Sequence, residues 1–327
     1  MAEAPSKRST SRLAGISLLA CLLSGCGLVV RQATIAYFAV DAHFSPKAIK
    51  IEIDKSFIEQ YKNRVTIRTV FTVDKAMGGP LPGALDGDLH FAGRAPQVAL
   101  PLVAEIANAS DQKAGAELIH RAEGTGKPLR ISGVWRIWPE HAGSAEEVQG
   151  TPLSAFDTYK PDHVFEIHPI TAINSFELLD SFTPVRGFSP GGAQRVFGIL
   201  GKVACGLTIL PKTVSIITET GLCNDVEFIM RISSDPQVVV SDGRFVTAAA
   251  LDLDGNVLVE RLRTVFVKGT PPEKAVRLLK SGDCVHIYGI PRLDFQQISL
   301  RANNPTIAEL PHPLPYEIVV LGVYAKN

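Results

Sequence analysis

Two stretches of the chain, LRISGVWRIW at residues 129–138 and VHIYGIPRLD at residues 285–294, are versions of one strand pattern. Each places an isoleucine two residues before a glycine and an arginine three residues after it: Ile131, Gly133 and Arg136, then Ile287, Gly289 and Arg292. Successive side chains of a strand point to opposite faces, so the isoleucine and glycine share the inner face and the arginine lies on the outer one. Glycine inside a strand marks a bend or a close backbone approach. The repeat therefore predicts two similarly built halves.

The segments around both stretches follow the same order. In the first half, strand-like residues 63–74 and 100–109 precede a helix-like segment at 111–124. In the second half, residues 242–267 read as two strands around a hairpin turn, and residues 270–282 read as a short helix that opens with prolines and stops at a glycine. Each helix leads through a glycine turn into the repeated strand. The sequence predicts a mainly β (α+β) chain of two small barrels in tandem with short helices.

This order is similar to the OB-fold, a five-stranded Greek-key barrel. Residues 242–293 resemble the barrels of single-stranded-DNA-binding proteins, on the positions Leu279, Lys280, Gly282, Val285, Ile287 and Gly289. The first half resembles a recurrent pattern of bacterial OB-fold-like proteins. These resemblances imply one OB-like domain over residues 48–186 and a second over residues 187–327.

The first 26 residues have the layout of a secretory leader. Basic Lys7, Arg8 and Arg12 are followed by the apolar run 13–23 and by small residues. The tetrapeptide Leu23-Ser24-Gly25-Cys26 resembles the lipobox of bacterial lipoproteins, which implies a signal peptide over 1–25, a diacylglyceryl group on Cys26 and a tether over 26–47. The chain is then anchored at the cell envelope and faces the periplasm, with Gly27 favouring the outer membrane. An uncleaved membrane anchor over 13–30 is the alternative.

Charge and composition restrict the partners. The chain has 33 basic and 33 acidic residues, and removal of residues 1–25 leaves 30 basic and 32 acidic ones, a formal charge of −2. Nucleic-acid-binding proteins usually carry a basic excess, so a nucleic-acid partner is not expected on net charge. We expect the membrane, through the lipid anchor, and an envelope protein or glycan as partners.

Three cysteines follow the leader: Cys205, Cys223 and Cys284. An oxidising compartment permits disulfides. Cys205 and Cys223 flank the strand-like segment TVSIIT and are predicted to pair, and three buried thiols are the alternative.

The segment DGDLH, residues 86–90, is a candidate metal site. Asp86 and Asp88 offer carboxylates, Glu105 of the next strand offers a third, and His90 lies beside them. The segment resembles the Asp-Gly-Asp turn of thermonucleases, although Leu89 stands where that family has threonine. An ordinary Asp-Gly turn is the competing interpretation.

Two further pairs are candidate functional residues. Glu166 and His168 lie on one strand face, and a carboxylate–imidazole pair can perform general acid–base catalysis or form an ion pair with Arg136. Trp138 beside Arg136 is a candidate platform for stacking a base or a sugar. For Glu166 and His168 the alternative is a pair of satisfied polar residues at the surface or rim, and for Trp138 it is core or interface packing.

Common catalytic signatures give little support to an enzyme: Gly-Lys-Ser/Thr, His-Glu-x-x-His and the dinucleotide fingerprint are absent from the sequence. The sequence therefore favours a non-catalytic binding or assembly module of the envelope, without a cofactor. One alternative is a metal-dependent phosphodiesterase or nuclease, and another is a protein that binds single-stranded nucleic acid. A divalent metal is expected only for the first of these.

Overall fold

The structure is a computed structural model that describes residues 48–143, 146–235, 237–304 and 312–325. The predicted signal peptide (1–25), the lipidation residue Cys26 and the tether (26–47) lie outside these residues. Within them, no helix combines the length and the apolar character that crossing a membrane requires.

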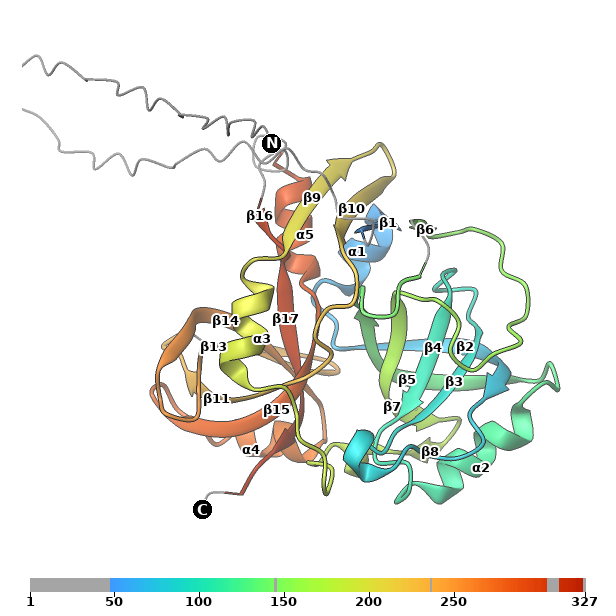
Figure 1. The fold of residues 1–327 in the computed structure, drawn as a ribbon, viewed down its shortest axis with the longest axis horizontal. Coiled ribbons are helices and arrows are strands. Elements are labelled where there is room, and N and C mark those ends of the chain that lie inside the picture. Colours follow the sequence, from blue (N-terminus) through green and yellow to red (C-terminus); the bar gives the residue numbers. More distant parts are fainter. Residues whose placement is uncertain (1–47, 144–145, 236, 305–311, 326–327) are drawn as a thin grey trace, which may run out of the picture. The chain divides into compact units, whose positions relative to one another are not determined.

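The first barrel (Figure 1) consists of β2 (Thr66–Ala76), β3 (Leu89–Arg94), β4 (Leu102–Ile106), β5 (Pro128–Ile137) and β7 (Phe165–Ile173). The strands neighbour one another in the order β4–β3–β2–β5–β7, and parallel pairing of β4 with β7 closes the barrel. Helix α2 (Lys113–Ala122) comes between the third and fourth strands of the barrel, and β8 (Phe176–Glu177) is a short addition to β7. This is the strand order of an OB-like barrel, as predicted.

The second barrel repeats the plan with β11 (Val226–Ile232), β13 (Gly243–Leu251), β14 (Val257–Val267), β15 (Cys284–Leu293) and β17 (Tyr316–Val323). Here β11 pairs with β13 and β15, while β14 and β17 form the parallel pair. Helix α4 (Pro271–Val276) again precedes the fourth strand, and the Thr270 hydroxyl caps it. A short strand, β12 (Val238–Val240), pairs with β13. The predicted fold class of two OB-like barrels in tandem is confirmed.

A third sheet contains strands from both halves of the chain. Its order is β16 (His312–Pro313), β9 (Ala204–Ile209), β10 (Thr213–Glu219), β1 (Ala48–Asp54) and β6 (Glu146–Val148). The antiparallel β1–β10 pair sets Ile51 opposite Ile216, and both side chains are buried. The predicted boundary between residues 186 and 187 stays a prediction, and this sheet crosses it.

Three short helices complete the fold: α1 (Lys55–Tyr61), α3 (Ala193–Leu200) and α5 (Phe295–Ala302). Single turns of 3-10 helix lie at Gly83–Leu85 and Leu179–Ser181. Helices α1 and α5 meet through Phe57 and Phe295, whose ring centroids are 6.2 Å apart. These helices therefore extend the hydrophobic core beyond the barrels.

The two repeated stretches form β5 and β15, and their glycines are required by close contact. A Cβ atom on Gly133 would lie 2.8 Å from the carbonyl oxygen of Pro169, and one on Gly289 would lie 2.8 Å from a methyl group of Ile318. Ile131 and Ile287 are buried in the core, as the inner-face pattern predicts. The glycines therefore let the fifth strand of each barrel pack tightly on the fourth.

The arginines of the repeated stretches cross from one barrel to the other. Arg136 donates from Nε to the carbonyl oxygen of Pro291 (2.9 Å), and Arg292 donates from Nη1 to the carbonyl oxygen of Trp135 (3.0 Å). Each guanidinium also pairs with a carboxylate on the fifth strand of its own barrel. Arg136 meets Glu166, and Arg292 meets Glu317 at 2.7 Å. We call this reciprocal arrangement the arginine exchange; it joins β5 to β15.

Candidate functional site

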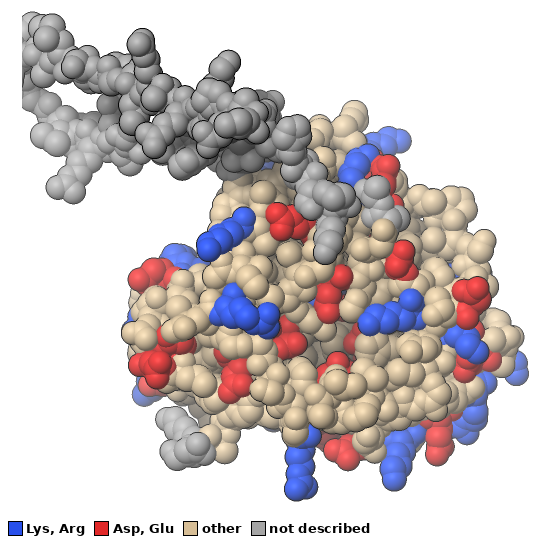
Figure 2. Space-filling model, in the orientation of Figure 1, with Lys and Arg blue, Asp and Glu red and all other residues tan. Residues whose placement is uncertain are grey.

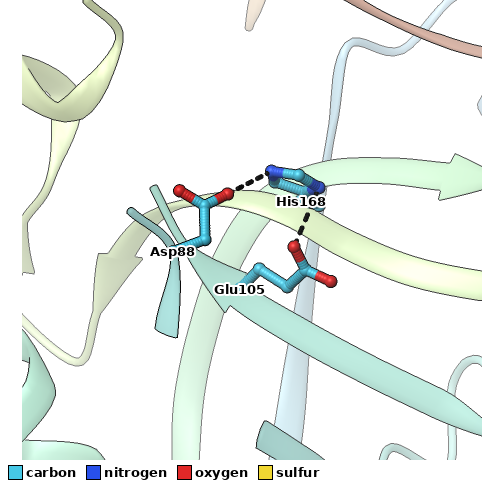
Figure 3. A group of neighbouring side chains, drawn as sticks. All are labelled: Asp88, Glu105 and His168. Atoms are coloured by element: carbon cyan, nitrogen blue, oxygen red, sulfur yellow. Dashed lines mark ion pairs between the residues drawn. The ribbon is translucent and has the colours of Figure 1, made fainter. Parts of the chain in front are cut away.

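Three side chains, two from strands and one from the turn before β3, gather at the seam where the first barrel closes (Figure 3). Asp88 immediately precedes β3, Glu105 lies in β4 and His168 lies in β7. His168 sits between the two acids, with Nε2 3.0 Å from Asp88 Oδ2 and Nδ1 3.1 Å from Glu105 Oε2. We call these three residues the seam cluster.

The local fold explains why these side chains meet. The turn before β3 is held by the Asp86 carboxylate, which accepts from the Asp88 backbone N–H (3.0 Å), while Asp88 accepts from the backbone N–H of Asn108 (3.2 Å). In β4 and β7, Glu105 and His168 alternate with the core residues Ala104 and Ile167. Glu105 and His168 therefore point away from the barrel interior.

The cluster is nonetheless buried. Asp88, Glu105 and His168 are 4%, 4% and 5% exposed. Tyr288 of β15 is also buried, in an apolar cluster that includes Val134 of β5. Burial, and then the charge of Asp88, raise the pKa of the Tyr288 phenol well above its ordinary value. The second barrel thus helps to cover the outer face of the first.

The charged groups of the cluster shift one another's pKa values. Burial alone would lower the pKa of His168, but Glu105, Asp88 and Glu166 raise it well above its ordinary value. Burial raises the pKa of Asp88, and His168 opposes this without cancelling it. The pKa of Glu105 is lowered, because the charges of His168 and His90 outweigh burial. The protonated ring therefore stabilises the ionised carboxylates, and the ionised carboxylates stabilise the protonated ring.

Two neighbours flank the cluster. His90 lies with Nδ1 3.4 Å from Glu105 Oε1, and its Nε2 is buried without a hydrogen-bond partner. Asp86 is half-buried, and burial together with the charge of Asp88 raises the pKa of its carboxyl group to about 6. The His90 imidazole and the Asp86 carboxyl group can therefore both contact a ligand held at the seam.

The structure merges two sites that the sequence predicts separately. The metal candidates Asp88 and Glu105 meet His168 of the acid–base pair, and Asp86 lies next to them. Glu166 is turned toward Arg136, and its Oε2 lies 3.7 Å from His168 Nδ1. His163 also contacts Glu166 (3.3 Å) and had no recognisable signal in the sequence. The parallel β4–β7 pairing that unites these residues is invisible in local sequence patterns.

The predicted stacking platform is wrong. Trp138 and Arg136 are 1% and 0% exposed. The Trp138 indole donates to the carbonyl oxygen of Cys223 (2.9 Å), and Arg136 is engaged in the arginine exchange. Arg136 points out of its barrel, as predicted, but the second half of the chain covers that face, so no ligand can stack there.

The predicted Cys205–Cys223 disulfide is not formed. Cys205, Cys223 and Cys284 are free, and burial raises the pKa of the Cys205 thiol to about 12. The β9–β10 hairpin places Ala204 beside Thr218, whose hydroxyl donates to the Ala204 carbonyl oxygen (3.1 Å), so Cys223 lies beyond the end of the hairpin.

The segment GFSPG, residues 187–191, matches Gly-x-Ser-x-Gly and was not singled out from the sequence. In hydrolases this pattern forms a nucleophile elbow between a strand and a helix. Here residues 183–191 contain no strand, and Gly191 donates its N–H to Asp225 (2.5 Å). The adjoining cavity of about 640 Å³ is lined, among the described residues, by no histidine. The segment is a turn.

A groove of about 530 Å³ lies on the outer face of β2, β5 and β7. Its lining includes Arg68, Arg130, Gln97 and Asn174, all of which are exposed, together with one carboxylate, Glu177. In the β2–β5 register, Arg130 is opposite Val70, two residues from Arg68, so the two arginines are diagonal neighbours on one face. Within the described ranges no carboxylate lies at ion-pair distance from either guanidinium. The groove can accept an acidic ligand.

Comparisons with known proteins add little. No protein-family model and no curated protein matches the chain. Among solved structures, it is similar to the wild-type single-stranded DNA binding protein of Thermus aquaticus, with 11% identity, 80% of this chain and 92% of that chain covered, and a TM-score of 0.22. A deletion mutant of the same protein gives 10% identity, coverage of 80% and 93%, and a TM-score of 0.22. The fold assignment above rests on the strand order.

Proposed function

We propose that the chain is a lipid-anchored protein of the bacterial envelope that faces the periplasm from the outer membrane and acts as a non-catalytic binding module. The lipobox-like Leu23–Cys26 after a basic and apolar leader supports the anchor. The burial of Asp88, Glu105 and His168 to 5% exposure or less supports the non-catalytic role, because a dissolved substrate does not reach them.

The groove on the first barrel is the observation that carries the binding role. Arg68 and Arg130 lie side by side without a partnering carboxylate among the described residues, and Gln97 and Asn174 add hydrogen-bonding groups. Guanidinium groups bind carboxylates and phosphates with two parallel hydrogen bonds. An envelope glycan that carries such groups therefore fits the groove better than a neutral ligand.

Titration of acidic envelope-glycan fragments into the full-length protein tests this role. We expect binding by the wild type and a loss of at least about tenfold in affinity when Arg68→Gln and Arg130→Gln are combined, since each charge-assisted bond contributes about 1.5–3 kcal/mol. Arg261→Gln on the second barrel is the matched control: its side chain is 72% exposed and it pairs with Asp235. Equal binding by all three proteins, or binding of single-stranded oligonucleotides in place of glycans, would contradict the proposal.

The anchor is tested separately in cells supplied with labelled palmitate. We expect label and membrane association in the wild type, and neither with Cys26→Ser. A protein that is membrane-bound without label would indicate the uncleaved anchor over residues 13–30 and refute lipidation.

A metal-dependent phosphodiesterase is the second candidate, because the structure unites Asp88, Glu105 and His168. Metal-stimulated hydrolysis of phosphodiesters by the wild type, abolished by Asp88→Asn, would replace the binding role with this one. Nucleic-acid binding has less support. Such proteins combine a positively charged groove with aromatic side chains on which bases stack, and among the described residues no aromatic side chain lines the groove on the first barrel. The face drawn in Figure 2 carries acidic and basic side chains interspersed.

A further inference from the structure

We infer that Asp88, Glu105 and His168 form a structural binding site for one divalent transition-metal cation of the Zn²⁺ or Mn²⁺ class, at the seam that closes the first barrel. This inference goes beyond the binding role proposed above and does not depend on it.

The donor atoms have the required spacing. One ligand atom from each of the three residues lies within 4.8 Å of the other two, and all three side chains are buried. Zinc binds such nitrogen and oxygen ligands at about 2.0–2.2 Å. Asp88 faces Nε2 of His168 and Glu105 faces Nδ1, so the Glu105 carboxylate must turn toward Nε2 to complete the site. Once Glu105 has turned to an ion on Nε2, the Nδ1 atom keeps Glu166 Oε2, at 3.7 Å, as its neighbouring carboxylate. An outer carboxylate of this kind orients metal-bound histidines.

The hydrogen bonding of His168 points independently to a ligand. Both of its ring nitrogens are buried and neither makes a hydrogen bond of acceptable geometry, although the carboxylates are only 3.0 and 3.1 Å away. His90, 8% exposed, adds a third such nitrogen, Nε2, and its Nδ1 lies 3.4 Å from Glu105 Oε1. Buried polar atoms without partners are rare in native proteins, and a cation would satisfy the His168 lone pair.

The local charge balance also fits a divalent ion. Glu166 is matched by Arg136, so Asp88 and Glu105 remain as two buried carboxylates that share one imidazole. Unpaired buried charge is costly. A divalent cation that binds His168 in place of its proton compensates both carboxylates.

The ligand set selects the class of metal. One imidazole and two carboxylates, with a water in the remaining position, suit Zn²⁺ and Mn²⁺, whereas Ca²⁺ takes six to eight oxygen ligands and Mg²⁺ retains several waters. An exposure of 4–5% leaves no room for a substrate. The ion would join β4 to β7, whose parallel pairing spans only three residue pairs, from Leu102↔Phe165 to Ala104↔Ile167. Its role would therefore be to hold the barrel closed.

The test uses the full-length protein after chelator treatment, with Zn²⁺ and Mn²⁺ alone as probes and Mg²⁺ and Ca²⁺ as comparisons. Calorimetry and elemental analysis give the stoichiometry. We expect one Zn²⁺ or Mn²⁺ per chain and, at 100-fold excess over Kd, a Tm raised by about 5–10 °C. Asp88→Asn and Glu105→Gln, which keep the side-chain shape, should each weaken binding at least about 100-fold and remove the Tm shift.

The matched controls are Glu227→Gln and His286→Asn, an acid–imidazole pair on the second barrel with a separation of 2.7 Å and side chains 23% and 32% exposed. They should leave stoichiometry and Tm shift unchanged. Absence of one tightly bound ion in the wild type overturns the inference, as does binding that survives both Asp88→Asn and Glu105→Gln. If a variant fails to fold, anomalous diffraction from wild-type crystals soaked in Zn²⁺ decides whether the ion contacts His168.

Discussion

Glu147 is an ionisable side chain that the fold buries beside the first barrel. It is 5% exposed; Oε2 accepts from the Val164 backbone N–H (3.2 Å) and Oε1 has no hydrogen-bond partner. Burial raises the pKa of its carboxyl group from 4.5 to about 7, against the Val164 hydrogen bond and the charge of His163, while Asp162 adds to the rise. The folded state therefore holds this proton more tightly than the unfolded state.

The sign of the resulting pH dependence follows from linkage. Between pH 4.5 and 7 the folded chain binds more protons at Glu147, so this residue makes the free energy of unfolding fall as pH rises through that range, by at most about 3 kcal/mol. Glu147→Gln should remove this fall and be more stable than the wild type at pH 8. Urea unfolding at pH 5 and pH 8 measures it, with exposed Glu117→Gln as control. A larger stability loss for Glu147→Gln at pH 8 than at pH 5 would contradict the prediction.

At the scale of the element, the repeated strand shows what local sequence can and cannot predict. Its inner face was predictable, because alternation and the glycine depend only on the strand and its own barrel: Ile131 and Ile287 are buried and both glycines are closely approached. The contacts of its outer face were not predictable, because the partners of Arg136 and Trp138 lie far along the chain. These partners are the carbonyl oxygens of Pro291 and Cys223. For the same reason, only part of the seam cluster could be predicted from the sequence. Asp88 and Glu105 were paired from their hairpin, and His168 joins them only through the β4–β7 pairing.

The glycine of the repeated strand gives a prediction about one element. Gly133→Ala should destabilise the fold by about 1–3 kcal/mol, because the added methyl group overpacks against Ile167 and the Pro169 carbonyl oxygen. Gly198→Ala in α3 is the matched control: no atom lies within 4 Å of the added Cβ, and alanine should stabilise that helix by roughly 0.5–1 kcal/mol. Thermal unfolding monitored by circular dichroism compares the two. Equal stability of the two variants would show that the close approach at Gly133 is not required.

For the whole molecule, two kinds of contact couple the barrels into one folding unit. The arginine exchange joins β5 to β15, and an apolar cluster between the barrels includes Val65 and Val134 of the first with Phe245 and Val319 of the second. The third sheet adds backbone pairing between β1 and β10. Barrels that share buried contacts of this extent should not unfold independently. We therefore expect one cooperative transition, as in two-state proteins.

The second guanidinium of the exchange provides the test of this coupling. Arg292 is fully buried, stacks on the Trp135 ring at 3.7 Å and donates to the Trp135 carbonyl oxygen. Arg292→Met removes these contacts, and Arg263 then remains as the ion-pair partner of buried Glu317. The substitution should lower the free energy of unfolding by about 3–5 kcal/mol. Arg261→Met, whose guanidinium is at the surface, should cost no more than about 0.5 kcal/mol. Guanidinium unfolding is followed by circular dichroism and by tryptophan emission, which reports Trp135 and Trp138 in and beside the first barrel. Both probes should shift together in Arg292→Met, although the substitution is in the second barrel; an unchanged tryptophan transition would mean that the barrels unfold separately.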